Sequence, residues 1–251
     1  MSPNLLILGG TLEASALAHA VAKAGMMATL SYAGRVARVK AQPIPRRVGG
    51  FGGVCGLVRY LKDHKITHVI DATHPFAAQM SENAVAACQQ TATGLLALTR
   101  PPWRRDAGDR WQHVGDIAAA VTALSGPKKR VMLAIGRLHL AQFGRCPQHD
   151  YLLRLVDAPD MPPPLPHHHV VISRGPFTVA EDIALLQSHD IELVVAKNAG
   201  GSGAQAKILA ARRLNLPVLM IDRPVLPPRD EVDSVDAVLA WLGHDGTERG
   251  V

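Results

Sequence analysis

The chain has 251 residues, of which 47% are hydrophobic and only 4% aromatic. This length can bury a substantial core and allows one domain or two. The formal net charge of +6 favours an anionic ligand. The Lys and Arg residues are scattered, however, without the basic stripe and stacking aromatics of a nucleic-acid-binding module. We therefore expect a small polyanion as the ligand, and no nucleic acid.

The N-terminal residues do not have the pattern of a signal peptide, and no apolar run approaches the length of a membrane span. The three cysteines, Cys55, Cys88 and Cys146, are far apart and show no C-x-x-C spacing. Free thiols are typical of a reducing compartment. We expect a cytoplasmic protein that has no membrane partner.

The first predicted strand, residues 5–8, ends in Gly9-Gly10-Thr11 before a helix predicted over 12–24. The two glycines let backbone N–H groups approach a diphosphate, and Thr11 can cap a helix whose positive dipole end faces that anion. A simple turn is an equal alternative, because the full G-x-G-x-x-G pattern is absent.

A second strand is predicted over 27–32 and ends in Ser31-Tyr32-Ala33-Gly34-Arg35. In dinucleotide-binding folds an acid at this position binds the ribose hydroxyl of NAD, whereas a basic or hydroxyl residue suits the phosphate of NADP. No acid is present, which favours NADPH. The alternative is that Arg35 is a solvated loop arginine.

Residues 48–53 carry four glycines around Phe51, which is typical of a loop that closes over a flat ligand or of an irregular entry to the helix predicted over 54–63. A third strand over 67–71 precedes Thr73 and His74, and a helix is predicted over 76–90. Open α/β sheets bind ligands at the carboxyl edge where these side chains lie. A structural role for His74 remains the alternative.

The strand and helix pattern continues through the rest of the chain. Strands are predicted over 95–99, 111–114, 130–135, 151–156, 170–173, 192–196 and 217–221, and helices over 117–124, 138–143, 179–189, 204–214 and 232–242. Because the pattern restarts after Ser125-Gly126-Pro127, we predict domains over 1–126 and 127–251. The expected fold is α/β: two Rossmann-like domains with mostly parallel sheets flanked by helices and a ligand cleft between them.

His167-His168-His169 raises the question of a metal site. Adjacent residues of an extended chain point in opposite directions, and no Cys or Glu at ligand spacing completes a site. We predict no metal.

Several motifs, in order along nearly the whole chain, resemble the precorrin-6A reductase family of cobalamin (vitamin B12) biosynthesis. The most specific are Asp71-Ala72-Thr73-His74-Pro75-Phe76-Ala77 and Lys197-Asn198-Ala199-Gly200-Gly201. The others are Gly9-Gly10-Thr11, Ala33-Gly34-Arg35, Val48-Gly49-Gly50-Phe51-Gly52-Gly53, Arg100-Pro101, Gly175-Pro176-Phe177 and Arg223-Pro224.

The resemblance implies reduction of one double bond of the tetrapyrrole precorrin-6A to precorrin-6B, with hydride from NADPH. The carboxylates of this substrate match the excess positive charge and would bind arginines. The resemblance also implies handover of the product to other enzymes of the pathway.

Matching the motifs assigns Gly9, Gly10 and Thr11 to the cofactor diphosphate, and Ser31, Tyr32, Gly34 and Arg35 to the ribose phosphate. It places Thr73 and His74 near the nicotinamide and the reacting ring, as the catalytic residues. It assigns the substrate carboxylates to Arg137, Ser173, Arg174, Lys197, Asn198, Gly200 and Gly201. Glu13, in the first helical turn, is out of place because it would repel a diphosphate.

Three alternatives remain open. One is a cobalt-precorrin-6A reductase that uses NADH, although the acid-free end of the second strand favours the metal-free substrate and NADPH. Another is a transferase with two Rossmann-like domains and a nucleotide-activated donor, although no Asp-x-Asp motif is present. The third is a nucleotide-binding module without catalysis, which tight NADPH binding without reduction of any precorrin would support.

Overall fold

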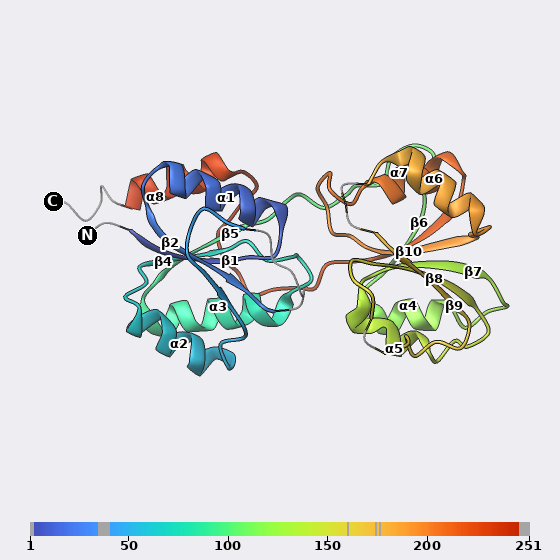
Figure 1. Ribbon diagram of the computed structural model, residues 1–251, viewed down its shortest axis with the longest axis horizontal. Helices are drawn as coiled ribbons and strands as arrows, with labels where there is room; N and C mark the ends of the chain where they lie inside the picture. The colour runs from blue at the N-terminus through green and yellow to red at the C-terminus, as the bar shows by residue number, and fades with distance from the viewer. Residues whose placement is uncertain (1–2, 35–40, 160, 174, 176, 246–251) are drawn as a thin grey trace. The chain divides into compact units, whose positions relative to one another are not determined.

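The computed structural model describes residues 3–34, 41–159, 161–173, 175 and 177–245. The chain forms two compact units (Figure 1). The first unit contains residues 1–101 and 225–251, and the second contains residues 102–224. Each unit is a parallel sheet covered by helices on both faces, which confirms the predicted α/β class.

The sheet of the first unit has six strands in the order β12-β5-β4-β1-β2-β3, all parallel. The strands are β1 (Asn4–Leu8), β2 (Met27–Tyr32), β3 (Arg46–Val48), β4 (His68–Asp71), β5 (Gly94–Leu98) and β12 (Glu231–Val232). Helices α1 (Leu12–Lys23) and α8 (Val235–Asp245) cover one face, and α2 (Gly53–Asp63) and α3 (Ala78–Thr91) cover the other (Figure 1).

Strand β1 shows why this sheet is apolar on both faces. Leu5 and Ile7 pack into the core beneath α1 and α8, whereas Leu6 and Leu8 pack into the core formed with α2 and α3. All four side chains are buried, because alternate residues of a strand point to opposite faces and both faces are covered.

The second unit repeats this plan. Its six parallel strands have the order β6-β11-β10-β7-β8-β9. They are β6 (Arg110–Val114), β7 (Arg130–Ala134), β8 (Asp150–Leu155), β9 (His168–Ile172), β10 (Leu193–Lys197) and β11 (Pro217–Ile221). Its helices are α4 (Ile117–Ala123), α5 (Leu140–Phe143), α6 (Val179–Ser188) and α7 (Ala206–Arg213), with a 3₁₀ turn η1 (Arg137–His139).

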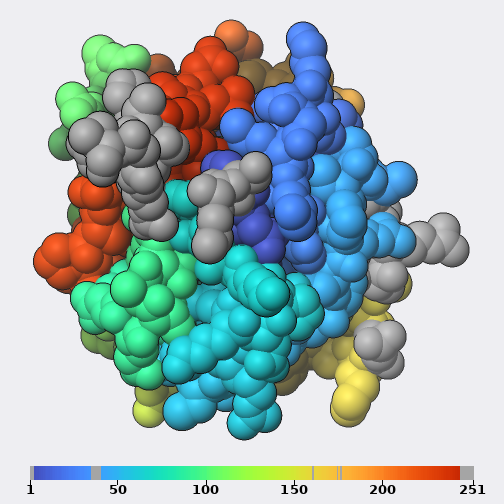
Figure 2. Space-filling model, turned by 90° about the vertical axis from the view of Figure 1, so that its left-hand side faces the viewer, coloured from blue at the N-terminus to red at the C-terminus, as the bar shows by residue number. Residues whose placement is uncertain are grey.

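The expected boundary at Gly126 is wrong. Strand β6 and helix α4 precede that residue but belong to the second unit, while β12 and α8 return to the first. Each sheet is thus completed at one edge by a strand from the other side of the expected boundary. Figure 2 shows the red C-terminal segment sharing one surface with the blue and cyan N-terminal segments.

Most predicted elements are confirmed, and the differences lie at short strands and helix ends. Strands β3 and β12 were not predicted, because three and two residues are too few to show a period. The helix expected over 76–90 is Ala78–Thr91, capped at Ala77, so that Thr73 to Phe76 lie in the loop before it. In the described part of the chain no helix is long and apolar enough to cross a membrane.

Candidate functional site

The turn after β1 lies where the strand order of the first sheet reverses, between β1 and β4. Ligands of open α/β sheets bind at this point. Gly9 is packed so closely that an added Cβ would lie 2.7 Å from Leu30 Cδ1, and its N–H donates to the Ser31 carbonyl over 2.9 Å. Gly10 has φ of +119°, which side chains rarely tolerate, and nothing lies within 4 Å of its Cβ position. The turn therefore presents bare backbone at its outer side.

Thr11 joins this turn to the turn after β4. Its hydroxyl oxygen accepts a hydrogen bond from Ala14 N at 3.1 Å, which caps α1. The same hydroxyl donates to the Ala72 carbonyl over 2.7 Å. The predicted diphosphate turn and the predicted catalytic turn are therefore fastened to each other within one unit.

The turn after β4 is organised by the buried carboxylate of Asp71. Asp71 Oδ1 accepts from Thr73 N at 3.1 Å and from Thr73 Oγ1 at 2.7 Å. Asp71 Oδ2 accepts from Ser81 Oγ at 2.6 Å and forms an ion pair with Arg229, from the segment that returns to this unit. The side chains of both charged partners are buried, at 1% and 7% exposure.

His74 lies exposed in the same turn. Its Nδ1 accepts a hydrogen bond from Phe76 N at 3.2 Å. An accepting Nδ1 carries no proton, so the neutral ring has its proton on Nε2. The backbone thereby selects one tautomer of the predicted catalytic histidine.

The carboxyl end of β2 holds the residues predicted for the ribose phosphate. Ser31 is buried, and its hydroxyl oxygen accepts from Arg47 Nη1 at 2.8 Å. Burial raises the pKa of the Tyr32 phenol, while hydrogen bonds with Ser15 and Gln42 lower it by less. Gly34 follows in a bend, and Arg35 lies outside the described residues.

Glu13, which was out of place beside a diphosphate, has a charged partner. Its Oε2 accepts a hydrogen bond from Arg100 Nη1 at 2.8 Å, and both side chains are largely buried. The ion pair neutralises the carboxylate at the start of α1, so the expected repulsion is removed.

The residues predicted for the substrate carboxylates belong to the second unit. Arg137 opens η1, which begins three residues after the end of β7, and Lys197 ends β10, so both lie at the carboxyl edge where the order of the second sheet reverses. Ser173 follows β9, and its N–H donates to the Leu155 carbonyl at 2.9 Å. Arg174 lies outside the described residues.

Asn198 is buried and engaged by the backbone of Trp103. Its Oδ1 accepts from Trp103 N at 2.8 Å, and its Nδ2 donates to Trp103 O at 3.0 Å. Trp103 Nε1 in turn donates to the Gly201 carbonyl over 2.7 Å, next to Gly200. The Asn198 side chain thus holds the segment that enters the second unit next to the Lys197 and Gly200-Gly201 turn.

Residues 4–243 match the model of the family described as Precorrin-6x reductase CbiJ/CobK. The chain belongs to this precorrin reductase family. The resemblance inferred from the motifs is thereby confirmed, and the matched residues include both turns of the first unit.

Named relatives in the precorrin reductase family differ in their similarity to the chain. It is 59% identical to the Precorrin-6A reductase of Rhodobacter capsulatus over 249 residues, which covers 99% of each chain. A solved structure of "CobK precorrin-6A reductase" has a TM-score of 0.94 and 59% identity, and covers 99% of this chain and 100% of that one. The Cobalt-precorrin-6A reductase of Priestia megaterium is 28% identical over 88% of this chain and 90% of the relative.

The sequence did not predict the contacts that Arg47, Arg100 and Arg229 make with Ser31, Glu13 and Asp71. Arg229 lies 158 residues from Asp71 along the chain, so no local pattern could pair them. The signal for Arg100 was present, because Glu13 needed a cation at the start of α1.

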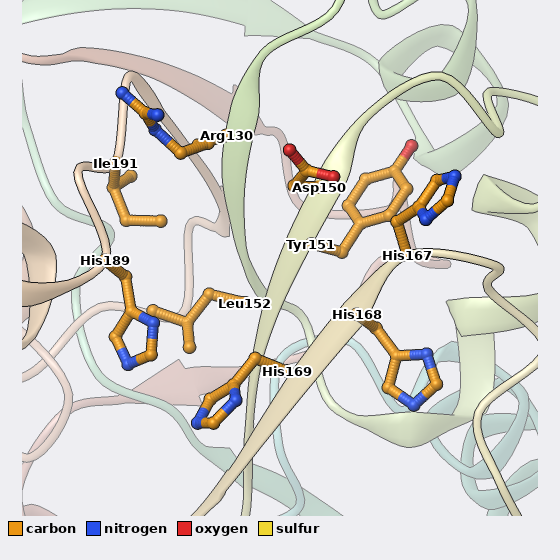
Figure 3. A pocket seen from close by; sticks show the side chains of 9 residues that line it. All are labelled: Arg130, Asp150, Tyr151, Leu152, His167, His168, His169, His189 and Ile191. Atoms are coloured by element: carbon orange, nitrogen blue, oxygen red, sulfur yellow. The ribbon is translucent and has the colours of Figure 1, made fainter.

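A cavity of about 260 Å³ lies near the amino ends of strands β7, β8, β9 and β10, away from the carboxyl edge that holds Arg137 and Lys197 (Figure 3). It is lined by Arg130, Asp150, Tyr151, Leu152, His167, His168, His169, His189 and Ile191. The rings of His169 and His189 approach to 4.6 Å between centroids. Within the described ranges no three His, Cys, Asp or Glu side chains are grouped to hold a metal ion.

Proposed function

We propose that the chain reduces one double bond of precorrin-6A to give precorrin-6B in cobalamin biosynthesis, with NADPH as the hydride donor. The observation that carries this proposal is the hydrogen bond of 2.7 Å from the Thr11 hydroxyl to the Ala72 carbonyl. It links the Gly9-Gly10-Thr11 turn, which suits a diphosphate, to the Thr73-His74 turn. Family membership supplies the reaction class.

The first unit fits a dinucleotide. The N–H groups at the start of α1 and the bare backbone at Gly10 suit a diphosphate, and the Arg100 partner cancels the charge of Glu13. NADPH supplies the hydride when bound. The Thr73 hydroxyl donates to Asp71, so toward a ligand it acts as an acceptor, whereas His74 presents a proton on Nε2.

We propose that the second unit binds the carboxylates of the substrate. Arg137 and Lys197 lie at the carboxyl edge of its sheet, where a polyanion gains from both charges. Ser173 and the Gly200-Gly201 turn add hydrogen-bonding groups at the same edge. The scattered excess of six positive charges would draw such a substrate to the protein.

The metal-free substrate is favoured over the cobalt-bearing one. The relative named for precorrin-6A is 59% identical to the chain, against 28% for the one named for cobalt-precorrin-6A. The end of β2 also lacks the acid that suits NADH. A cytoplasmic location and handover of the product stay predictions.

The direct test is anaerobic incubation of the protein with precorrin-6A and either NADPH or NADH. Loss of the cofactor absorbance band with a matching change in the tetrapyrrole spectrum, faster with NADPH, is expected. Oxidation only with cobalt-precorrin-6A would change the substrate, and no oxidation with either substrate would refute the proposed reaction.

Variants separate the roles in the first unit. His74→Ala should lower turnover with little change in NADPH binding, because it removes the Nε2 proton but no cofactor contact. The matched control is His19→Ala, which removes an exposed histidine on α1 whose Nδ1 hydrogen-bonds the Ser15 carbonyl. An unchanged rate for His74→Ala would make His74 a structural residue.

A further inference from the structure

Arg47 brings a cation to the carboxyl end of β2 from the neighbouring strand. In the β2 and β3 pairing, Ser31 and Arg47 are register partners. Arg47 Nη1 donates to Ser31 Oγ over 2.8 Å and to the Gly49 carbonyl over 2.9 Å, and Nη2 donates to the Gly50 carbonyl over 3.1 Å. The half-buried guanidinium is thereby held beside the last residues of β2.

Two aromatic rings fix the plane of this guanidinium. Its central carbon lies 3.8 Å from the ring centroid of Phe51 and 5.3 Å from that of Tyr60. The two rings contact each other edge to face at 5.2 Å. Stacking on aromatic faces holds an arginine in one orientation and lowers the entropy lost on binding.

The charge of Arg47 has no carboxylate partner among the described residues. By contrast, Arg100 and Arg229 pair with Glu13 and Asp71 in the same unit. The three hydrogen bonds use both Nη1 hydrogens and one Nη2 hydrogen, so Nε and Nη2 each keep an N–H for a further acceptor. A half-buried, oriented cation with two spare donors fits a bound anion.

We propose that Arg47 determines the cofactor specificity of this protein by binding the 2′-phosphate of NADPH. The proposal rests on the function proposed above, in which the cofactor occupies the carboxyl edge of the first sheet. Ser31 Oγ accepts from Arg47, so its own hydrogen is available to the same phosphate. NADH has a hydroxyl at this position and leaves the cation uncompensated.

The test measures binding of 2′,5′-ADP (adenosine 2′,5′-bisphosphate) and of 5′-AMP by calorimetry, because the two nucleotides differ only in the 2′-phosphate. The unsubstituted protein should prefer 2′,5′-ADP. Arg47→Met should weaken binding of 2′,5′-ADP by about 10- to 100-fold, because it removes a charged hydrogen-bonded pair, and should change binding of 5′-AMP little. The matched control is Arg46→Met, which removes the same charge from the adjacent position of β3 and should keep the preference.

Thermal melting shows whether Arg47→Met folds. If it does not fold, two further variants still test the role of Arg47. Arg47→Lys keeps the charge but loses the planar fork, and should lose part of the preference. Ser31→Asp places a carboxylate against Arg47, and should reverse the preference in favour of 5′-AMP.

The outcomes distinguish this inference from the function on which it rests. If the unsubstituted protein prefers 2′,5′-ADP and Arg47→Met keeps that preference, Arg47 is not the determinant but NADPH remains the cofactor. Equal losses for both nucleotides would show that Arg47 only shapes the loop, and would overturn the inference as well. If the unsubstituted protein binds neither nucleotide, the proposed cofactor and the inference are both wrong.

Discussion

Replacing Arg229 by methionine should destabilise the first unit while leaving the second intact. The substitution keeps much of the apolar stem but removes the cation that faces the buried carboxylate of Asp71, whose side chain is 1% exposed. Leaving such a charge unpaired costs about 3 to 5 kcal/mol. The hydrogen bonds that Asp71 accepts from Thr73 and Ser81 remain, so we expect the lower part of that range.

Urea unfolding followed by hydrogen exchange measures this loss unit by unit. With a slope of about 2 kcal/mol per molar urea, a loss of about 3 kcal/mol moves the midpoint of the first unit by roughly 1.5 M. Amides of β4 and β5 should exchange faster, and those of β7 and β10 should not. The matched control is Arg59→Met, on the exposed side of α2.

A double-mutant cycle checks the physical reason. Asp71→Asn combined with Arg229→Met removes both charges, so the double variant should be more stable than the sum of the two single losses predicts. If Arg229→Met costs less than about 1 kcal/mol, or the two losses simply add, the buried pair is not what holds the returning segment in place.

Three further predictions follow from packing and burial. Gly56→Ala places a Cβ 1.7 Å from the Phe51 carbonyl oxygen and should cost about 1 to 3 kcal/mol or more in a thermal melt; Gly126→Ala, where nothing lies within 4 Å, is the control. A thiol reagent should modify exposed Cys55 quickly and the two buried cysteines only after denaturation, and rapid reaction of all three in native protein would contradict the fold. Burial, and less strongly the charge of Asp71, raises the pKa of Cys88 to about 12, so the folded state keeps its proton where the unfolded state loses it. Stability should therefore fall as the pH rises above about 9, by up to about 1.4 kcal/mol per pH unit, and less steeply in Cys88→Ala.

The sequence predicts elements well where a period is long enough to read, and poorly where pairing partners are distant. The four apolar residues of β1 predict a strand buried on both faces, and the structure shows one. Strand β12 has two residues and exists because it pairs with β5, which lies more than a hundred residues earlier. Sheet membership is therefore set by tertiary pairing, and the expected boundary at Gly126 could not reveal it.

The candidate site shows the same limit. The Gly9-Gly10-Thr11 turn and the Thr73-His74 turn were recognisable because their chemistry lies within a few residues. Arg47 was not singled out from the sequence, since nothing local distinguishes a solvated arginine from one stacked on Phe51. Asn198 was assigned to the substrate, but its amide is used by a backbone 95 residues away.

The return of residues 225–243 to the first unit has a consequence for synthesis. A ribosome makes all of residues 102–224 before it makes β12, so the second unit has its complete sequence while the first still lacks an edge strand, a helix and the cation for Asp71. The first unit, whose synthesis begins first, is therefore completed after the second unit. A stop codon after residue 224 would spare every strand of the second sheet and still remove Arg229, the cation that pairs with Asp71 in the turn after β4.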